Sequence, residues 1–449
     1  MLPDYQILDP NVDRLPREAL AALQSERLRH MVRYVYTRAP FWRRKFDAAG
    51  LRPEDITGID DLPKIPFCTK SELQQDQLQH PPFGSYVCSE PSTWRYYAAT
   101  SGTTGRPLRR VLSARDFGYL LDRFRRKPLL KPGDIALILG PTDGLLGPTI
   151  AIESSRCVGA LPIAASLYDT ETKVRMIAEL RPAFITGTAS YLLRMLEVAE
   201  QLGINLAQAG VRVVSSVGEP GAALAATRKR LQDGFGGAAI SDGYGLTELF
   251  PLGGRCVGND ALHIAPDMAL TEVVDPTTGA LLPPGQLGEV VVTNLICDTQ
   301  PLLRFRTRDL SRLATEPMCP ACGFTGARLE GSIVGRVDDM IWYRGVNVFP
   351  SAIAEVLGRF SELGTEYRVI VAGDSALPTL AIRVETLRPL DGAARALLTQ
   401  RIASAVRDAV RVHAAVELVD PGTLPRGDGR SKIRRVIDAR PRQTSEVPI

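Results

Sequence analysis

The strongest constraint on the fold is an alternation of short apolar segments with helical stretches between residues 110 and 241. The apolar segments are 135–139, 184–186, 211–217 and 238–241, and helical spacing covers 172–180 and 191–202. Strands separated by helices of this length pair in parallel and are buried on both faces. We therefore predict an α/β fold built around a mostly parallel sheet.

The flanking segments differ from this pattern. Residues 16–50 have helical spacing, 272–295 alternate as an antiparallel β region does, and the chain beyond residue 338 predicts a compact α+β unit. A chain of 449 residues is long enough for more than one core. We place the boundary in the charged, glycine-punctuated segment, giving a large N-terminal domain over 1–336 and a small C-terminal domain over 337–449.

One run, Thr100 to Pro107, has the composition of a phosphate-binding loop. Ser101, Thr103 and Thr104 supply hydroxyl donors, whereas Gly102 and Gly105 allow backbone conformations that turn N–H groups toward an anion. Short strands on either side predict the tip of a hairpin, unlike the strand-to-helix turn of a Walker loop. A polar surface turn remains the alternative from the run alone.

Two further polar motifs follow predicted strands. They are Gly218-Glu219-Pro220 and the run from Asp242 to Glu248, and ligands of parallel sheets bind at such strand ends. Thr247 and Glu248 offer a hydroxyl and a carboxylate that suit a phosphate and its Mg²⁺, while Tyr244 could stack on a base. Taken singly, each motif is equally typical of a glycine-rich loop.

A metal site is predicted from four residues that are distant in sequence. Cys319 and Cys322 form a Cys-x-x-Cys knuckle, and Cys256 and His263 are the nearest candidates to complete a tetrahedral Zn²⁺ site. Four ligands leave no position for water, so the role would be structural. The alternatives are a redox Cys-x-x-Cys, which the surrounding pattern disfavours, and four unrelated residues.

Charge and hydropathy exclude some classes of function. A net charge of +4 gives no reason to expect nucleic acid as a partner. No run of about 18 apolar residues is present and the first ten residues lack an apolar core, so we expect no membrane span and a cytoplasmic protein.

Taken together, these motifs resemble the phenylacetate–coenzyme A ligases, a branch of the adenylate-forming superfamily. The resemblance extends from about Leu20 to Asp438, in matching order and spacing. Its matching segments are Leu62 to Phe67, Thr100 to Pro107, Val217 to Pro220, Tyr244 to Glu248, Pro301 to Asp309 and Gly335 to Ser351.

The resemblance implies a role for each matched position. Thr100, Ser101, Gly102, Thr103, Thr104 and Gly105 would hold the ATP phosphates, and Gly218, Glu219, Pro220, Tyr244 and Gly245 would belong to the adenine side of the site. Thr247 would contact the α-phosphate, Glu248 would bind Mg²⁺, Asp309 would hold the ribose and Arg336 would lie beside the nucleotide. Asp338 matches the hinge of a mobile C-terminal domain, and Gly345 would line the thiol channel. Cys256, His263, Cys319 and Cys322 resemble a zinc site of some members.

The sequence departs from the family at three places. Relatives end in Pro-Arg-Ser-Glu-Gly-Lys, whereas residues 425–432 read Pro-Arg-Gly-Asp-Gly-Arg-Ser-Lys, so Lys432 is the candidate catalytic lysine and Arg430 is the alternative. A lysine ammonium can bridge the attacking carboxylate and the α-phosphate. Arg308 stands where relatives usually have glycine. Residues 140–147 replace a more aromatic loop of the acid pocket, so phenylacetate itself is in doubt.

The implied activity is a two-step ligation. A carboxylic acid, aromatic or aryl-substituted, would react with Mg·ATP to an acyl-adenylate, and coenzyme A would then displace AMP. One alternative keeps adenylation but passes the acid to an amine, a carrier protein or another acceptor. A second is a nucleotide-binding protein that has lost catalysis, suggested by Arg308 and the displaced lysine. A homodimer is compatible with either, because the sequence does not set the oligomeric state.

Overall fold

The computed structural model describes residues 11–100, 106–126, 129–256, 258–343, 346–373, 379–426 and 435–440. The α-helices in these ranges are α1 (Arg17–Arg38), α2 (Pro40–Ala48), α3 (Lys70–Gln79), α4 (Ala114–Arg126), α5 (Leu146–Cys157), α6 (Thr170–Leu180), α7 (Ala189–Gln201), α8 (Ala225–Gly234), α9 (Pro350–Gly358) and α10 (Gly392–Val410). None of the helices in these ranges is long and apolar enough to cross a membrane.

Strands form one large sheet and three smaller ones. Those before residue 340 are β1 (Trp94–Ala99), β2 (Arg109–Ser113), β3 (Ile135–Ile138), β4 (Leu161–Ala164), β5 (Phe184–Gly187), β6 (Val213–Ser216), β7 (Ala239–Leu246), β8 (Phe250–Arg255), β9 (Leu262–Ile264), β10 (Ala269–Val274), β11 (Gly288–Asn294), β12 (Phe305–Leu313) and β13 (Arg328–Arg336). Those after it are β14 (Ile341–Tyr343), β15 (Val346–Val348), β16 (Leu363–Ala372), β17 (Thr379–Thr386), β18 (Ala415–Val419) and β19 (Val436–Asp438).

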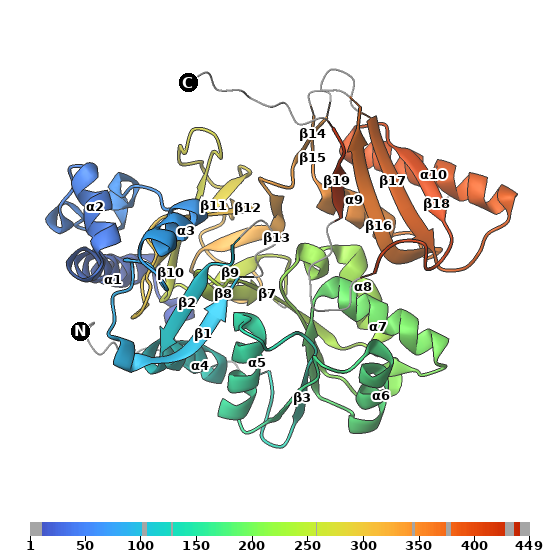
Figure 1. Ribbon diagram of the computed structural model, residues 1–449, viewed down its shortest axis with the longest axis horizontal. Coiled ribbons are helices and arrows are strands. Elements are labelled where there is room, and N and C mark those ends of the chain that lie inside the picture. The colour runs from blue at the N-terminus through green and yellow to red at the C-terminus, as the bar shows by residue number, and fades with distance from the viewer. Residues whose placement is uncertain are drawn as a thin grey trace.

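The large sheet joins the two strand patterns that the sequence predicts. It has eleven strands in the order β10-β11-β12-β13-β9-β8-β7-β6-β5-β3-β4. Its β4, β3, β5, β6 and β7 pair in parallel, as the βα alternation predicts, and the remaining pairs are antiparallel. The predicted α/β class is therefore confirmed, with parallel and antiparallel strands continuous in one sheet (Figure 1).

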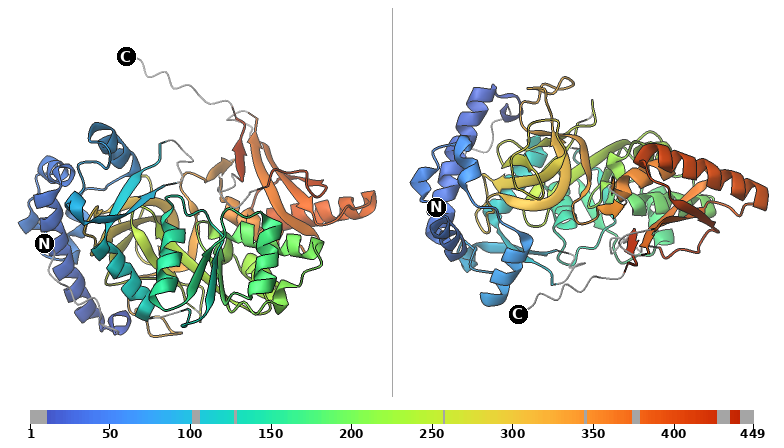
Figure 2. Two further views of the ribbon diagram at one scale, coloured as in Figure 1. Left: turned by 60° about the horizontal axis from the view of Figure 1, so that its bottom comes forward. Right: turned by 90° about the horizontal axis from the view of Figure 1, so that it is seen from above.

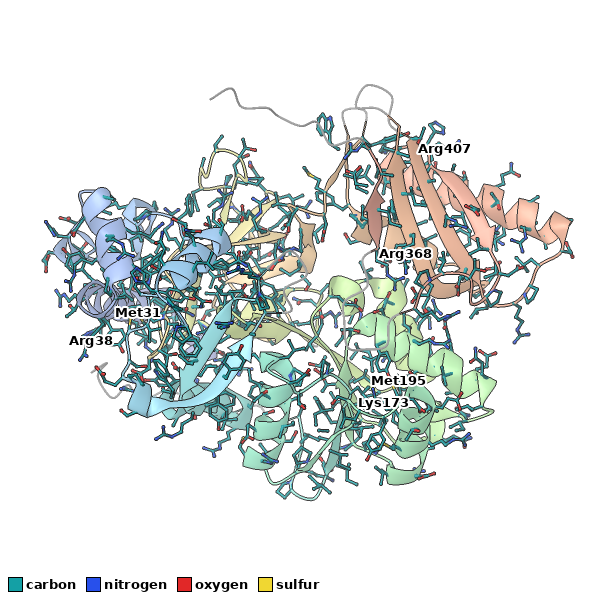
Figure 3. All side chains as sticks on the ribbon, viewed as in Figure 1. Met31, Arg38, Lys173, Met195, Arg368 and Arg407 are labelled. Atoms are coloured by element: carbon teal, nitrogen blue, oxygen red, sulfur yellow. The ribbon has the colours of Figure 1, made fainter. Side chains whose placement is uncertain are left out.

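Both faces of the parallel part are covered, which explains its nearly continuous apolar strands. In β3, Leu137 belongs to a core cluster with α6 and α7, whereas Ala136 and Ile138 belong to a second cluster with side chains of α5. A buried cation lies at the edge of the first cluster: Lys173 of α6 donates to the Tyr191 hydroxyl at 3.1 Å (Figure 3). The helices thus fix the sheet whose strand ends carry the polar motifs.

One predicted strand boundary is wrong. The sequence indicates that the strand before the Tyr244 motif ends at Ser241, but β7 continues to Leu246. Its parallel pairing with β6 ends at Asp242, and from Gly243 onward it pairs antiparallel with β8. Tyr244 and Gly245 therefore lie within a strand, at the point where the sheet changes from parallel to antiparallel.

The N-terminal helices cover the antiparallel part. Leu28, Met31 and Val32 of α1 share a core cluster with Val290 of β11 and Phe305 of β12. The predicted helical lead-in over 16–50 is thus confirmed as α1 and α2. Figure 2 shows these helices at the opposite end of the molecule from the C-terminal lobe.

A second lobe begins after β13. The sheet β18-β17-β16-β19 packs on α9 and α10 and has its own core, from Ile341 to Leu418. This C-terminal lobe lies above α7 and α8 in Figure 1. Polar contacts cross the junction: Glu197 of α7 accepts the Thr365 N–H at 2.9 Å and pairs with Arg426 at 3.1 Å. Both lobes therefore border the space between them.

Candidate active site

A single cleft of about 2020 Å³ between the two lobes brings together most of the described residues that the sequence singles out. Its lining comes from separate segments of the chain. The predicted site residues in it are Thr100, Gly218, Glu219, Tyr244, Gly245, Thr247, Glu248, Asp309, Arg336 and Asp338. The C-terminal lobe adds Tyr367 of β16 and Arg435. The cleft is the only part of the described structure in which these motifs converge.

Some predicted residues cannot be placed. Ser101, Gly102, Thr103, Thr104, Gly105, Gly345, Lys432 and its alternative Arg430 lie outside the described residues. Pro220 begins a short 3₁₀ helix, Pro220–Ala223, directly after Glu219. The roles expected for these positions remain predictions.

Thr100 lies at the base of the predicted phosphate hairpin. β1 and β2 pair antiparallel, with Ala99 opposite Arg109, which confirms the hairpin. Thr100 donates its N–H to the Leu108 carbonyl at 3.0 Å, and its hydroxyl accepts the Leu108 N–H at 3.0 Å. These two bonds hold the ends of the run together at the rim of the cleft.

A chain of hydrogen bonds joins residues from β7, β12 and β13. The Tyr244 hydroxyl donates to Asp309 Oδ2 at 2.9 Å, and Arg336 donates to Asp309 Oδ1 at 2.9 Å. Arg336 also pairs with Asp338 at 3.1 Å. Burial, with the Asp309 carboxylate second, raises the pKa of Tyr244 well above its usual value, so the phenol keeps its proton and acts as a donor. Asp309 is thereby oriented from both sides.

The Thr247–Glu248 turn is held by groups that the sequence does not single out. Arg110 of β2 stacks over the Phe250 ring at 4.0 Å and donates to the carbonyls of Thr247, at 2.8 Å, and Glu248. The Glu248 side chain is 6% exposed and pairs with Lys70 at 3.0 Å. No motif marks Arg110 or Lys70, because their partners are far along the chain.

Two glycines, Gly218 and Gly245, line the cleft at positions where the backbone favours glycine. Gly245 is required because a Cβ there would lie 2.7 Å from the Pro251 Cα of the neighbouring strand. Gly218 has φ +90°, a left-handed conformation that favours glycine. Next to them, burial raises the pKa of Asp242 to about 6, although the Ser332 hydroxyl donates to it at 3.2 Å. Backbone geometry therefore favours glycine at both Gly218 and Gly245.

Arg308 occupies a strained position beside Asp309. Its φ is +65°, in the left-handed region that favours glycine, the residue that the family resemblance leads us to expect there. Its N–H donates to the buried Glu289 at 3.0 Å, and its guanidinium lies 3.8 Å from Glu289 and 3.9 Å from Asp338. The guanidinium is 42% exposed, so these long ion pairs contribute little.

We expect Arg308→Gly to be more stable than Arg308→Ala. Both remove the weak ion pairs, but only glycine relieves the left-handed strain, which costs roughly 1–2 kcal/mol for a residue with a Cβ. Thermal unfolding of the two variants measures the difference directly. An alanine variant as stable as the glycine variant would show that the backbone at residue 308 is not strained.

The far side of the cleft is apolar. Residues 140–147 all line it, as do Ile138, Ile150 and Phe184, which are themselves buried in the core. Asp143 of this loop is exposed. This side can accommodate an uncharged organic group next to the polar side built around Asp309 and Glu248.

The four predicted metal ligands converge away from the cleft. One potential ligand atom from each of Cys256, His263, Cys319 and Cys322 lies within 4.8 Å of the others. Cys256 Sγ and Cys319 Sγ are 4.0 Å apart, and Cys322 Sγ is 3.9 Å from His263 Nδ1. Bonds of tetrahedral Zn²⁺ place neighbouring ligand atoms about 3.5–3.8 Å apart. The donor set and spacing therefore fit this ion.

Comparisons with known proteins show which family and fold this chain is similar to. A family model described as AMP-binding enzyme matches residues 19–295, and one described as AMP-binding enzyme C-terminal domain matches 345–440. Phenylacetate-coenzyme A ligase of Thermus thermophilus is 35% identical over 455 residues, which cover 96% of this chain and 99% of that protein.

Two crystal structures of one 2-hydroxyisobutyryl-CoA ligase are also similar to this chain. In the postadenylation state with R3-HIB-AMP, that ligase matches with a TM-score of 0.88 and 29% identity, over 98% of this chain and 94% of its own. With 2-HIB-AMP and CoA in the thioesterification state, the TM-score is 0.70 at 30% identity, over 96% of this chain and 92% of its own.

Proposed function

Since the chain belongs to the phenylacetate–coenzyme A ligase-like family of adenylate-forming enzymes and is an AMP-forming acid–thiol ligase, we propose that its cleft activates an aromatic or aryl-substituted carboxylic acid. ATP and the acid give an acyl-adenylate and pyrophosphate, and the thiol of coenzyme A then displaces AMP. The observation that carries the proposal is the convergence of Tyr244, Glu248 and Asp309, from separate segments, on one cleft beside an apolar wall.

The nucleotide would lie along the polar side of the cleft. Asp309, oriented by Tyr244 and Arg336, has a carboxylate suited to accept hydrogen bonds from the ribose hydroxyls. Gly218, Glu219 and Gly245 would line the adenine. Thr247 would contact the α-phosphate, and the run from Thr100 to Gly105 would hold the β- and γ-phosphates. Mg²⁺ bound at Glu248 would offset phosphate charge.

The first step requires positioning rather than acid–base chemistry. A carboxylate oxygen forms a bond to the α-phosphorus, the bond from that phosphorus to the bridging oxygen breaks, and its electron pair leaves with pyrophosphate. No proton is transferred, which fits a cleft of fixed donors and charges. We assign the charge that bridges the carboxylate and the α-phosphate to Lys432.

The second step would use another arrangement of the lobes. The higher TM-score with the postadenylation state than with the thioesterification state, for the same ligase, supports a resting arrangement like the former. The proposed boundary lies between β13, which ends at Arg336, and β14. Asp338 is in this connection and would act as the hinge, and Gly345 would line the path of the thiol.

The acid would occupy the apolar side. Pro141, Leu145 and Leu167 line the cleft with apolar side chains that are not fully buried, and they would favour an aryl group over a short polar chain. Acid-dependent exchange of labelled pyrophosphate into ATP tests the activation step. Formation of a CoA thioester with the same acid tests the acceptor, and exchange without thioester would show that another acceptor is used.

The cluster of Cys256, His263, Cys319 and Cys322 would hold a structural Zn²⁺. Its chemistry would be that of a closed four-ligand site, linking β8, β9 and the loop before β13.

We expect about one zinc per chain in the purified protein by elemental analysis, with Cys319→Ser losing the metal and at least several degrees of melting temperature. Cys157→Ser, a cysteine of α5 that lies outside the cluster, is the matched control. Equal zinc contents in wild type and Cys319→Ser would contradict the assignment, as would a wild-type chain that takes up no zinc.

A further inference from the structure

We propose that Lys70 binds the β- and γ-phosphates of ATP and the departing pyrophosphate, an inference that rests on the proposed function. The residues around it, Thr69 to Glu72, have the pattern of a capping box, which indicates only a helix start. The structure places its Nζ 3.0 Å from Glu248 Oε1, and Thr69, Lys70 and Ser71 all line the cleft. Lys70 is therefore a positive charge inside the site, next to the carboxylate expected to hold Mg²⁺.

The backbone before Lys70 is fixed to the strand that carries Asp309. Cys68 donates its N–H to the Arg304 carbonyl at 3.0 Å, and its carbonyl accepts the Arg306 N–H at 2.8 Å. Thr69 then caps α3, since its hydroxyl accepts the Glu72 N–H and its own N–H donates to Glu72. The first turn of α3 is thus held in place from β12.

Helix α3 is also hydrogen-bonded to the C-terminal end of the predicted phosphate run and to the start of β2. Gln74 donates to the Arg106 carbonyl at 2.6 Å, and Gln77 donates to the Arg109 carbonyl at 2.6 Å. Arg106 belongs to the Thr100–Pro107 run, and Arg109 lies two residues beyond its end. The helix that begins with Lys70 thus contacts Glu248 at its first residue and the chain at Arg106 and Arg109 further along.

The charge balance at Glu248 depends on this lysine. Among the described residues, Lys70 is the basic side chain that pairs with the Glu248 carboxylate. Arg110 is also near, but it donates to the backbone carbonyls of Thr247 and Glu248. The Lys70 side chain is 39% exposed, so it can leave Glu248 without losing contact with solvent. An ammonium with three rotatable donors can make that exchange.

Lys70 would act on the leaving group of the first step. As the carboxylate oxygen bonds to the α-phosphorus, the bond to the bridging oxygen breaks and pyrophosphate takes the electron pair. Lys70 keeps its proton and offsets the charge that develops on pyrophosphate. In the free protein it neutralises Glu248, and when Mg·ATP binds it would turn to phosphate oxygens.

A purely structural role makes a different prediction. If Lys70 served only to neutralise the buried Glu248, its loss would affect stability and both half-reactions alike. The second half-reaction, from a supplied acyl-adenylate and thiol, involves no pyrophosphate. A phosphate-binding lysine should therefore affect the first half-reaction and leave the second nearly unchanged.

The test uses Lys70→Met, Lys70→Arg and, as a matched control, Lys229→Met, which removes an exposed lysine of α8 paired with Asp233 at 2.8 Å. Loss of a charged hydrogen bond predicts roughly a 10- to 100-fold rise in the dissociation constants of Mg·ATP and Mg·pyrophosphate for Lys70→Met, measured by calorimetry. Lys70→Arg should recover part of that loss. Thioester formation from synthetic acyl-adenylate should stay near wild type in all three, whereas the melting temperature should fall in Lys70→Met because the buried Glu248 loses its partner.

Binding as tight as wild type in Lys70→Met, or equal losses in both half-reactions, would overturn the proposal. The proposed function fails separately, if the wild type shows no acid-dependent pyrophosphate exchange. Because calorimetry measures binding without turnover, the two failures are distinguishable.

Discussion

Replacing Glu248 by glutamine should lower the rate of acid-dependent pyrophosphate exchange by about a hundredfold or more, since metal charge at the phosphates supplies several kcal/mol to such transition states. The amide keeps the shape of the side chain but loses the charge that would bind Mg²⁺. The contacts from Arg110 reach only the backbone of residues 247 and 248, so the turn should keep its place. The Mg²⁺ concentration for half-maximal exchange should rise.

The control for this variant is Glu417→Gln, which removes an exposed carboxylate of β18 that pairs with Arg383. It should exchange pyrophosphate at the wild-type rate. If Glu248→Gln exchanges pyrophosphate within about threefold of the wild-type rate at saturating Mg²⁺, the metal is held by another group. Loss of a charged ligand should lower the rate by much more than threefold.

Lys432→Ala should separate the two half-reactions. Removing one preorganised charge from the developing phosphate centre costs about 10²- to 10³-fold in rate, so adenylation should nearly cease. Thioester formation from a supplied acyl-adenylate should stay within about threefold of wild type, since that step is proposed to proceed with the lysine moved away.

Arg430→Ala is the matched comparison, since Arg430 is the alternative two residues earlier. It should retain adenylation if Lys432 carries the role. The reverse pattern, with Arg430→Ala inactive and Lys432→Ala active, would assign the role to Arg430. Its charge is spread over a planar guanidinium, unlike the compact ammonium of lysine.

Local patterns were sufficient for much of the fold. Segments such as 135–139 and 184–186 are apolar because β3 and β5 are buried on both faces, so periodicity and length could find them. The boundary at Ser241 failed because Asp242-Gly243 has the composition of a turn, whereas β7 continues through these residues and changes its partner there. Nothing local marks a strand that passes from a parallel neighbour to an antiparallel one.

The candidate site was predictable where residue types are distinctive. Tyr244 and Asp309 stand out in glycine-rich or charged runs, and the structure brings them within 2.9 Å. Lys70 and Arg110 were missed because a single basic residue in a helix cap or a strand has no signature; only the long-range fold gives each its partner. The Thr69–Glu72 capping pattern beside Lys70 predicts a helix start but no contact with Glu248.

The backbone at Arg308 shows the opposite case. The sequence difference from relatives was visible, but its meaning was not, because only the structure reveals φ +65° beside Asp309. The structure thus adds that Arg308 introduces backbone strain next to the site.

Acid-dependent exchange of labelled pyrophosphate into ATP by the wild-type protein tests the central claim most directly. The panel should span aryl, arylacetic, amino-substituted and short hydroxy acids, with Mg²⁺ present and the acid omitted as the blank. We predict exchange that depends on at least one aryl or aryl-substituted acid. ATP binding without exchange for any acid of the panel would contradict acid activation by this cleft.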